Sequence, residues 1–266
     1  MLAPMMRLAV AGKGGVGKSV VSATLARLLA RRGHKVLVLD SDTLPGLTIS
    51  LGVDPPEQPP LLDAVEKNDK GRWRLRKGIG PVRAIQRYST PAPDGVRLLQ
   101  LGKLSREGSA PLFAATNAYY QIVHRISHDE RTGRASSLQD WVLLGDLPAG
   151  ARQIAYDWAP YAERFLLVVE PTSQSMMTAR RIARLVTGMR ADADIALVVN
   201  KARSAAEAEK VATFLEREPL AVVPFDHAVR LAEREGAALI DHAPACEAVA
   251  AIGRLADRLE ADSLVT

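Results

Sequence analysis

The segment from Gly12 to Ser19 has the residue types and spacing that point most directly to chemistry. It reads GKGGVGKS, which matches the pattern G-x-x-x-x-G-K-[ST], and it stands between a strand-like run and a helix-like segment over 20–32. Glycines let backbone N–H groups approach phosphate oxygens closely, while Lys18 reaches the β- and γ-phosphates and the Ser19 hydroxyl binds Mg²⁺. The predicted phosphate loop consists of Gly12, Gly14, Gly15, Val16, Gly17, Lys18, Ser19 and Val20.

Two carboxylates follow the second strand-like run, which reads HKVLVLDSD and ends with Asp40 and Asp42. Extended residues two apart point the same way, and the carboxyl ends of strands are where open α/β sheets bind ligands. Carboxylates beside a triphosphate repel it unless they serve Mg²⁺ or accept a proton from the attacking water. We therefore expect Asp42 to activate water and Asp40 to contact Mg²⁺ through its outer shell. The alternative is that both residues cap the following turn.

The elements around these residues predict an α/β fold. Short apolar runs alternate with helix-period segments, which is typical of a doubly wound, mostly parallel sheet of seven or eight strands with helices on both faces. We expect a single P-loop ATPase domain over residues 1–266, interrupted by a Pro- and Lys/Arg-rich surface insertion at about 54–93 with one or two short helices and a possible hairpin. The strand-like runs are 6–11, 35–40, 96–101, 141–144, 164–169, 195–199 and 220–223.

A second lysine in the loop, Lys13, has no role in a phosphate loop that binds only its own nucleotide. With it, GKGGVGKS resembles the deviant Walker A signature of the family that includes the partition and septum-site ATPases and the nitrogenase iron protein. In that family the extra lysine reaches the partner's nucleotide across a homodimer, so the resemblance implies an ATP-dependent dimer with Lys13, Lys18 and Asp42 as catalytic residues. An exposed loop lysine is the alternative.

The resemblance runs from about Met6 to Leu259 and implies further site residues. WVLLGD followed by LPAG resembles the second switch, which implies that Asp146 holds Mg²⁺ with Ser19 and Asp40, and that Gly150 senses the γ-phosphate. IALVVNK and AVVPFD resemble the base-binding strand ends and imply that Asn200, Lys201, Pro224 and Phe225 contact adenine. Thr43 and Gly46 depart from the family's first switch.

Within the family, DGVRLLQLGKL and LLVVEPTSQSMMTARRIARL look most like the carbon monoxide dehydrogenase maturation ATPases (CooC type). Nickel-inserting members carry a C-x-C pair, because soft thiolates are needed to hold that metal. This chain has one cysteine, Cys246, which we interpret as a buried small hydrophobe. His124 and His128 stand four residues apart, but they have no third ligand, so a solvated helix face is the favoured interpretation. We predict no structural metal site.

Composition and charge leave several partners open. The lone cysteine and the short start before the first strand suit the cytoplasm, and no stretch approaches the roughly 20 apolar residues of a spanning helix. We expect the net charge of +5 to reflect an Arg-rich surface rather than nucleic-acid binding, and the apolar stripe of the C-terminal helix over 247–259 to dock on the core. The leading hypothesis is a dimerising MgATPase that switches an unidentified client protein. The rival is a partition or positioning ATPase that binds DNA or membrane as an ATP dimer.

Overall fold

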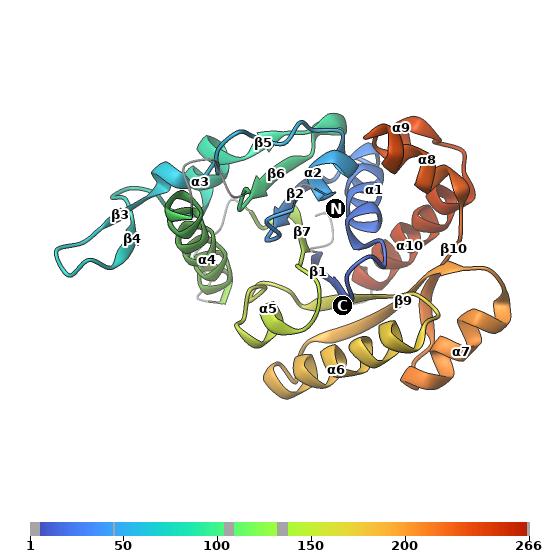
Figure 1. Cartoon of the computed structure of the whole chain (residues 1–266). Helices are drawn as coiled ribbons and strands as arrows, with labels where there is room; N and C mark the ends of the chain where they lie inside the picture. The colour runs from blue at the N-terminus through green and yellow to red at the C-terminus, as the bar shows by residue number, and fades with distance from the viewer. Residues whose placement is uncertain (1–5, 45, 104–108, 132–137, 265–266) are drawn as a thin grey trace.

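The structure is a computed structural model that describes residues 6–44, 46–103, 109–131 and 138–264. One mixed sheet of eight strands runs through the molecule in the order β10-β9-β8-β1-β7-β2-β6-β5 (Figure 1). Every neighbouring pair is parallel except β5 with β6, so the predicted mostly parallel sheet is confirmed. The strands are β1 Arg7–Gly12, β2 Lys35–Asp40, β5 Thr90–Pro91, β6 Arg97–Gln100, β7 Trp141–Asp146, β8 Arg164–Val169, β9 Asp194–Ala202 and β10 Pro219–Pro224.

Helices cover both faces of this sheet (Figure 1). One face packs against α1, α2, α8, α9 and α10, and the other against α3 to α7. The central strands are buried on both faces, which explains their near-continuous apolar sequences. The helices are α1 Lys18–Arg31, α2 Gly46–Leu51, α3 Pro81–Tyr88, α4 Ala110–Arg131, α5 Arg152–Ala155, α6 Ser173–Met189, α7 Ala205–Leu215, α8 His227–Glu235, α9 Leu239–His242 and α10 Glu247–Ser263.

Polar residues in the loops fix where several helices begin. The Ser204 side chain accepts a hydrogen bond from the Glu207 amide at the start of α7, at 3.3 Å. Asp226 accepts from Ala228 at 2.9 Å at the start of α8 and from Ala248 at 3.1 Å in the first turn of α10. These side chains satisfy amides that have no partner within their own helix. Asp226 thereby ties two helix starts to the end of β10.

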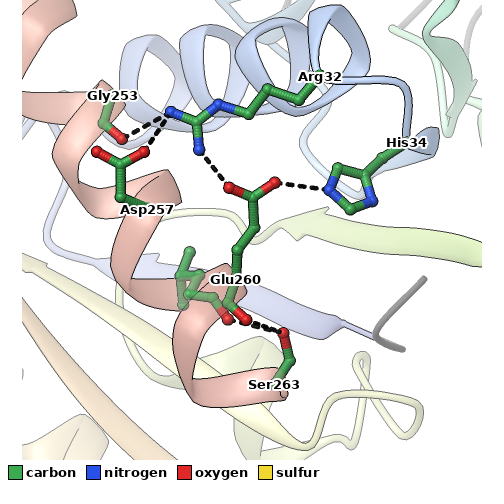
Figure 2. A network of polar contacts seen from close by, with 7 residues as sticks. Arg32, His34, Gly253, Asp257, Glu260 and Ser263 are labelled. Atoms are coloured by element: carbon green, nitrogen blue, oxygen red, sulfur yellow. Dashed lines mark hydrogen bonds and ion pairs between the residues drawn. The ribbon is translucent and has the colours of Figure 1, made fainter. Parts of the chain in front are cut away.

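The C-terminal helix α10 docks on the core, as its apolar stripe predicts, with Val249, Ile252, Leu255 and Leu259 buried. A polar network joins its last turns to the end of α1 (Figure 2). Arg32 forms ion pairs with Glu260 and with Asp257, the latter at 2.7 Å, and the ring Nε2 of His34 lies 2.7 Å from Glu260 Oε1. Across the described residues, no helix is long and apolar enough to cross a membrane.

The segment at 54–93 contains both elements expected of the insertion. A 3-10 turn at Leu62–Ala64 leads into an antiparallel hairpin, β3 Val65–Lys67 and β4 Trp73–Leu75, which projects past α4 (Figure 1). Helix α3 follows, and β5 then joins the edge of the main sheet against β6. A second 3-10 turn at Pro93–Gly95 returns the chain to β6.

Candidate functional site

The phosphate-loop motif lies at the carboxyl edge of the sheet, between β1 and α1. Strands β1 and β2 both pair with β7, and the registers place Val10 and Asp40 each beside Asp146. The ends of three strands therefore bring Gly12, Asp40 and Asp146 together from distant parts of the sequence. This is the edge at which open α/β sheets bind ligands.

Two glycines of the loop are required by the space around them. A Cβ at Gly12 would lie 2.4 Å from the carbonyl oxygen of Val168, and one at Gly17 would lie 2.4 Å from Asn200 Nδ2. Gly17 also has a φ of +91°, in the region that favours glycine. The loop therefore depends on glycine for backbone packing against β8 and β9 as well as for access to phosphate.

Lys18 and Ser19 open α1 and face the carboxylate at the end of β7. Ser19 Oγ donates to Asp146 Oδ2 at 2.8 Å, and Lys18 Nζ donates to the carbonyl oxygen of Lys13 at 3.4 Å. Burial lowers the pKa of Lys18, and the negative charges of Asp146 and Asp42 oppose that shift. The structure thus brings together three groups predicted to hold Mg²⁺ and phosphate: the Ser19 hydroxyl, the Lys18 ammonium and the Asp146 carboxylate.

Asp40 and Asp146 are both 2% exposed and lie side by side. Burial raises the pKa of Asp146 to about 6, although hydrogen bonds from Ser19 and Ser22 and the charge of Lys18 favour its ionised form. Burial, followed by the charge of Asp146, raises the pKa of Asp40 well above its usual value. Burial therefore disfavours the ionised form of both carboxylates in the protein alone. A bound cation would stabilise that ionised form, so the pair is suited to act on a metal ion.

Asp42 is more accessible than Asp40 and begins the loop between β2 and α2. Its amide donates to Asp40 Oδ1 at 3.0 Å, and its own Oδ1 accepts from the amide of Leu44 at 3.1 Å. Both carboxylates therefore cap the backbone two residues on, which is the alternative interpretation of this pair. Each keeps a second carboxylate oxygen outside these two bonds, so the roles in water activation and Mg²⁺ binding stay predictions.

Lys13 is the second residue of the phosphate loop, and Gly150 follows β7; both are half-buried. Among the described residues, no hydrogen bond or ion pair of the half-buried Lys13 side chain is found, while the amide of Gly150 donates to the carbonyl oxygen of Gly12 at 3.0 Å. The segment that resembles the family's second switch is thus hydrogen-bonded directly to the start of the phosphate loop. The trans role of Lys13 remains a prediction.

A cavity of about 210 Å³ lies next to the loop where the base of a nucleotide is expected. Asn200 lines it, but its Nδ2 donates to the carbonyl oxygen of Val16 at 2.7 Å and its Oδ1 accepts from the Lys201 amide at 3.0 Å. The side chain of Lys201 reaches the carbonyl oxygen of Gly15 and lies 3.5 Å from Glu170. In this structure the side chains of Asn200 and Lys201 therefore stabilise the phosphate loop through hydrogen bonds to its carbonyl oxygens. The cavity lining also includes Gly17, Val20, Pro224, Phe225 and Arg230.

Three further residues of the site are not predicted from the sequence. Ser22 Oγ donates to Asp146 Oδ1 at 3.1 Å, and Ser41 Oγ donates to the Asp146 carbonyl oxygen at 3.0 Å. The guanidinium of Arg203 lies 4.0 Å from the centre of the Phe225 ring, beside the cavity. Ser22 follows Ser19 by one helical turn, which is a signal that could have found it. No local pattern marks Ser41 or Arg203.

The side chains considered for a structural metal lie on separate elements, with His124 on α4 and Cys246 just before α10. Nε2 of His124 is 2.9 Å from the carbonyl oxygen of Asp157, and its ring packs on Tyr120. Cys246 precedes α10 and packs against the apolar core as a small hydrophobe, although it is half-buried rather than buried; this partial burial raises the pKa of its thiol. Over the described ranges, no three His, Cys, Asp or Glu side chains lie close enough to hold a metal ion.

Residues 8–240 match the family described as the CobQ/CobB/MinD/ParA nucleotide-binding domain. The chain belongs to this family. It is 28% identical over 256 residues to the carbon monoxide dehydrogenase accessory protein CooC of Rhodospirillum rubrum, covering 91% of this chain and 92% of that protein. It is 26% identical over 270 residues to the antiactivator FleN of Pseudomonas aeruginosa, covering 97% of this chain and 87% of that protein.

The crystal structure of the cell division ATPase MinD of Pyrococcus furiosus has the same fold. It superposes with a TM-score of 0.71 at 26% identity, covering 97% of this chain and 99% of that one. The predicted ParA/MinD membership and the CooC-like character of the sequence are therefore confirmed. The chain is a nucleotide-binding protein of the P-loop ATPase class.

Proposed function

We propose that this chain is a single P-loop domain that hydrolyses MgATP in the cytoplasm and uses hydrolysis to switch a client protein. The observation that carries the proposal is the constellation of Lys18, Ser19, Asp42 and Asp146 around a glycine loop at the carboxyl edge of the sheet. Family membership and the similarity to CooC support it. The related MinD of Pyrococcus horikoshii has been solved with Mg-ADP.

The residues around the loop fit a nucleoside triphosphate and Mg²⁺. The amides of the loop and the start of α1 would hold the phosphates, with Lys18 as the counter-charge. Ser19 would be a direct Mg²⁺ ligand, while Asp146 and Asp40 would act on its water shell. Pro224 and Phe225 would enclose the base in the adjacent cavity. Mg²⁺, when bound, would neutralise charge that develops on the phosphate oxygens.

Asp42 is the residue we propose as proton acceptor. It lies at the accessible end of β2, where one carboxylate oxygen can orient a water and accept its proton while the other is held by the Leu44 amide. Burial lowers the pKa of Lys18, while the charges of Asp146 and Asp42 favour the ammonium form that would neutralise the phosphates. Gly150 would respond to the phosphates through its hydrogen bond to Gly12.

Lys13 would act on the nucleotide of a second copy, which makes the active unit an ATP-dependent homodimer. No acidic partner among the described residues neutralises its side chain, and it is a half-buried residue of the phosphate loop itself. A cation supplied in trans stabilises the transition-state charge of phosphoryl transfer. Dimerisation and hydrolysis would then be coupled, so the dimer would open after each turnover.

The client would be an enzyme or complex that this ATPase helps to mature. The similarity to an accessory protein for carbon monoxide dehydrogenase supports such a role. Delivery of a metal by a C-x-C pair is outside the proposal, because the chain has the single cysteine Cys246. A partition or positioning ATPase is the alternative class and predicts ATP-dependent retention on DNA or membrane.

Phosphate release and molar mass by light scattering would test the proposal. Lys18→Ala should abolish nucleotide binding or turnover, whereas Asp42→Ala should bind ATP and remain dimeric without turnover. Lys13→Ala should weaken dimerisation or turnover but still bind ADP as a monomer, and Lys210→Ala is a matched exposed-lysine control. Wild-type turnover and dimerisation of Lys13→Ala would refute the trans-lysine mechanism.

A further inference from the structure

Positive charge is concentrated in the hairpin and the helix that follows it. Residues 66–88, here called the basic hairpin segment, contain eight basic and two acidic residues, a formal charge of +6. The whole chain has a net charge of +5, so the remainder is slightly acidic. The basic residues are Lys67, Lys70, Arg72, Arg74, Arg76, Lys77, Arg83 and Arg87, and all eight are exposed.

The base of the hairpin is anchored to α4. Val65 and Leu75 pair across the two strands and are buried in the core. Gln121 on α4 accepts from the Leu75 amide at 3.2 Å and donates to the Trp73 carbonyl oxygen at 3.4 Å. Arg125 on the same helix donates to the carbonyl oxygen of Ile79 at 3.2 Å. The hairpin is thus held at its base while the rest projects from the molecule (Figure 1).

The tip of the hairpin is a hydrogen-bonded turn. Asn68 Oδ1 accepts from the amides of Lys70 and Arg72 at 3.0 and 2.9 Å. The Asn68 amide donates to the Arg72 carbonyl oxygen at 2.9 Å, and Gly71 supplies a φ of +69°. Side-chain capping of this kind orders a turn without burying it. The basic side chains at the tip are therefore presented on an ordered backbone.

These cations are largely without carboxylate partners. Within residues 6–44, 46–103, 109–131 and 138–264, Arg74 pairs with Glu66 at 2.9 Å, and none of the other seven basic residues forms an ion pair. Lys67 lies over the Trp73 ring and Arg87 over Tyr88, which orients their aliphatic stems but leaves their charge uncompensated. An uncompensated, mostly arginine surface attracts a polyanion that arginine can bind in bidentate fashion.

We propose that the basic hairpin segment binds the phosphate backbone of nucleic acid. Protein interfaces depend on apolar side chains that become buried as anchors. Among the described residues of this segment, Val82 is the only exposed large hydrophobic side chain, so the segment offers little of that kind. The charge is instead spread along a two-stranded ribbon, an element narrow enough to enter the major groove of a duplex. Phosphate contacts require distributed cations and no apolar centre. This binding goes beyond the proposed ATPase function.

Binding by this segment would not depend on nucleotide. All eight basic residues come from one chain, and none belongs to the phosphate loop or to the carboxylates Asp40, Asp42 and Asp146. The proposal therefore differs from a surface that forms only in an ATP dimer. Binding should persist without ATP and in Lys18→Ala, so its failure and the failure of the ATPase proposal give different results.

Fluorescence anisotropy of the full-length protein would measure binding to a labelled mixed-sequence duplex of about 24 base pairs, beginning at about 50 mM salt. The test variant replaces Lys70, Arg72, Arg76 and Lys77 by glutamine; Lys70 and Arg72 stabilise the turn through their backbone amides, so the turn should persist. The control replaces four exposed basic residues elsewhere by glutamine: Arg181, Arg184, Lys210 and Arg254. Single-stranded RNA, polyglutamate and anionic vesicles are parallel probes.

We expect the four hairpin substitutions to weaken duplex binding at least about tenfold. The slope of the logarithm of the binding constant against the logarithm of the salt concentration should become shallower by about 0.9 for every phosphate that the variant no longer neutralises. The control variant should bind within about twofold of wild type, and basal ATPase activity should be unchanged in both. Equal losses of affinity in the two variants would overturn the proposal, because binding would then follow net charge. Tighter binding to polyglutamate or to vesicles, or no duplex binding at low salt, would also overturn it.

Discussion

Replacing Asp146 by asparagine should stabilise the nucleotide-free protein above about pH 6 while abolishing Mg²⁺-dependent ATP hydrolysis. The substitution preserves shape and removes the charge of a carboxylate that is 2% exposed beside Asp40. The hydroxyls of Ser19 and Ser22, which donate to this carboxylate, can rotate to accept from the new amide. The change therefore isolates the effect of ionising this carboxylate.

The magnitude follows from the pKa of Asp146, which burial raises from 3.8 to about 6. When folding raises the pKa of an acid, its protonated form contributes fully to the free energy of unfolding at pH values below the pKa of the unfolded state. This contribution is lost as the pH rises through the pKa of the folded state. At about 1.4 kcal/mol for each pKa unit, wild type should lose on the order of 3 kcal/mol relative to Asp146→Asn across this window. Removing the charge also relieves Asp40, which acts in the same direction.

Urea denaturation of both proteins at several values between about pH 4 and about pH 7.5 would measure this difference. Asp140→Asn is the matched control, because its side chain is 58% exposed and lies just before the same strand. The difference between wild type and Asp146→Asn should grow with pH, while that for Asp140→Asn stays flat. Parallel profiles for wild type and Asp146→Asn would refute the reasoning that Asp146 is ionised at a cost in the folded protein.

Three further substitutions test the packing around the site. Gly12→Ala should abolish ATP binding in a filter or calorimetric assay, because its Cβ would lie 2.4 Å from the Val168 carbonyl oxygen; retained affinity would contradict this close approach. Leu255→Ala should lower the free energy of unfolding by about 2–5 kcal/mol in urea, since the Leu255 side chain of α10 is fully buried, and a decrease below about 1 kcal/mol would contradict that docking. Glu260→Gln, at the polar contact with Arg32 and His34 (Figure 2), should cost only about 0.5–1 kcal/mol, and less at high salt; a salt-independent effect would indicate another cause.

Most of the sheet and the phosphate loop are predictable because their signals are local. Each core strand is buried on both faces, so its sequence is an apolar run, and GKGGVGKS contains the loop geometry within eight consecutive residues. The approximate position of the insertion is also visible in its Pro- and Lys/Arg-rich composition. The basic residues of 66–88 are already close together in the sequence, and the structure shows that the β3–β4 hairpin within this segment projects from the molecule (Figure 1).

The arrangement of the site depends on contacts between residues far apart in the chain. Asn200 braces Val16, and Ser41 supports Asp146, because parallel strands bring their carboxyl ends to one edge whatever their separation in sequence. Gly145 illustrates the same point: a Cβ there would lie 2.0 Å from the hydroxyl oxygen of Tyr161, a constraint that no neighbouring residue indicates.

The sequence by itself therefore determined the class of protein, the phosphate loop and the candidate carboxylates, since these depend on periodicity and on motifs within short segments of the chain. Tertiary structure alone decided that Asp40 and Asp146 are buried against each other, that Asn200 is already hydrogen-bonded to the loop, and that Cys246 is half-buried. Burial and pairing are properties of the assembled sheet and its covering helices. They arise from strand order, which no local segment encodes.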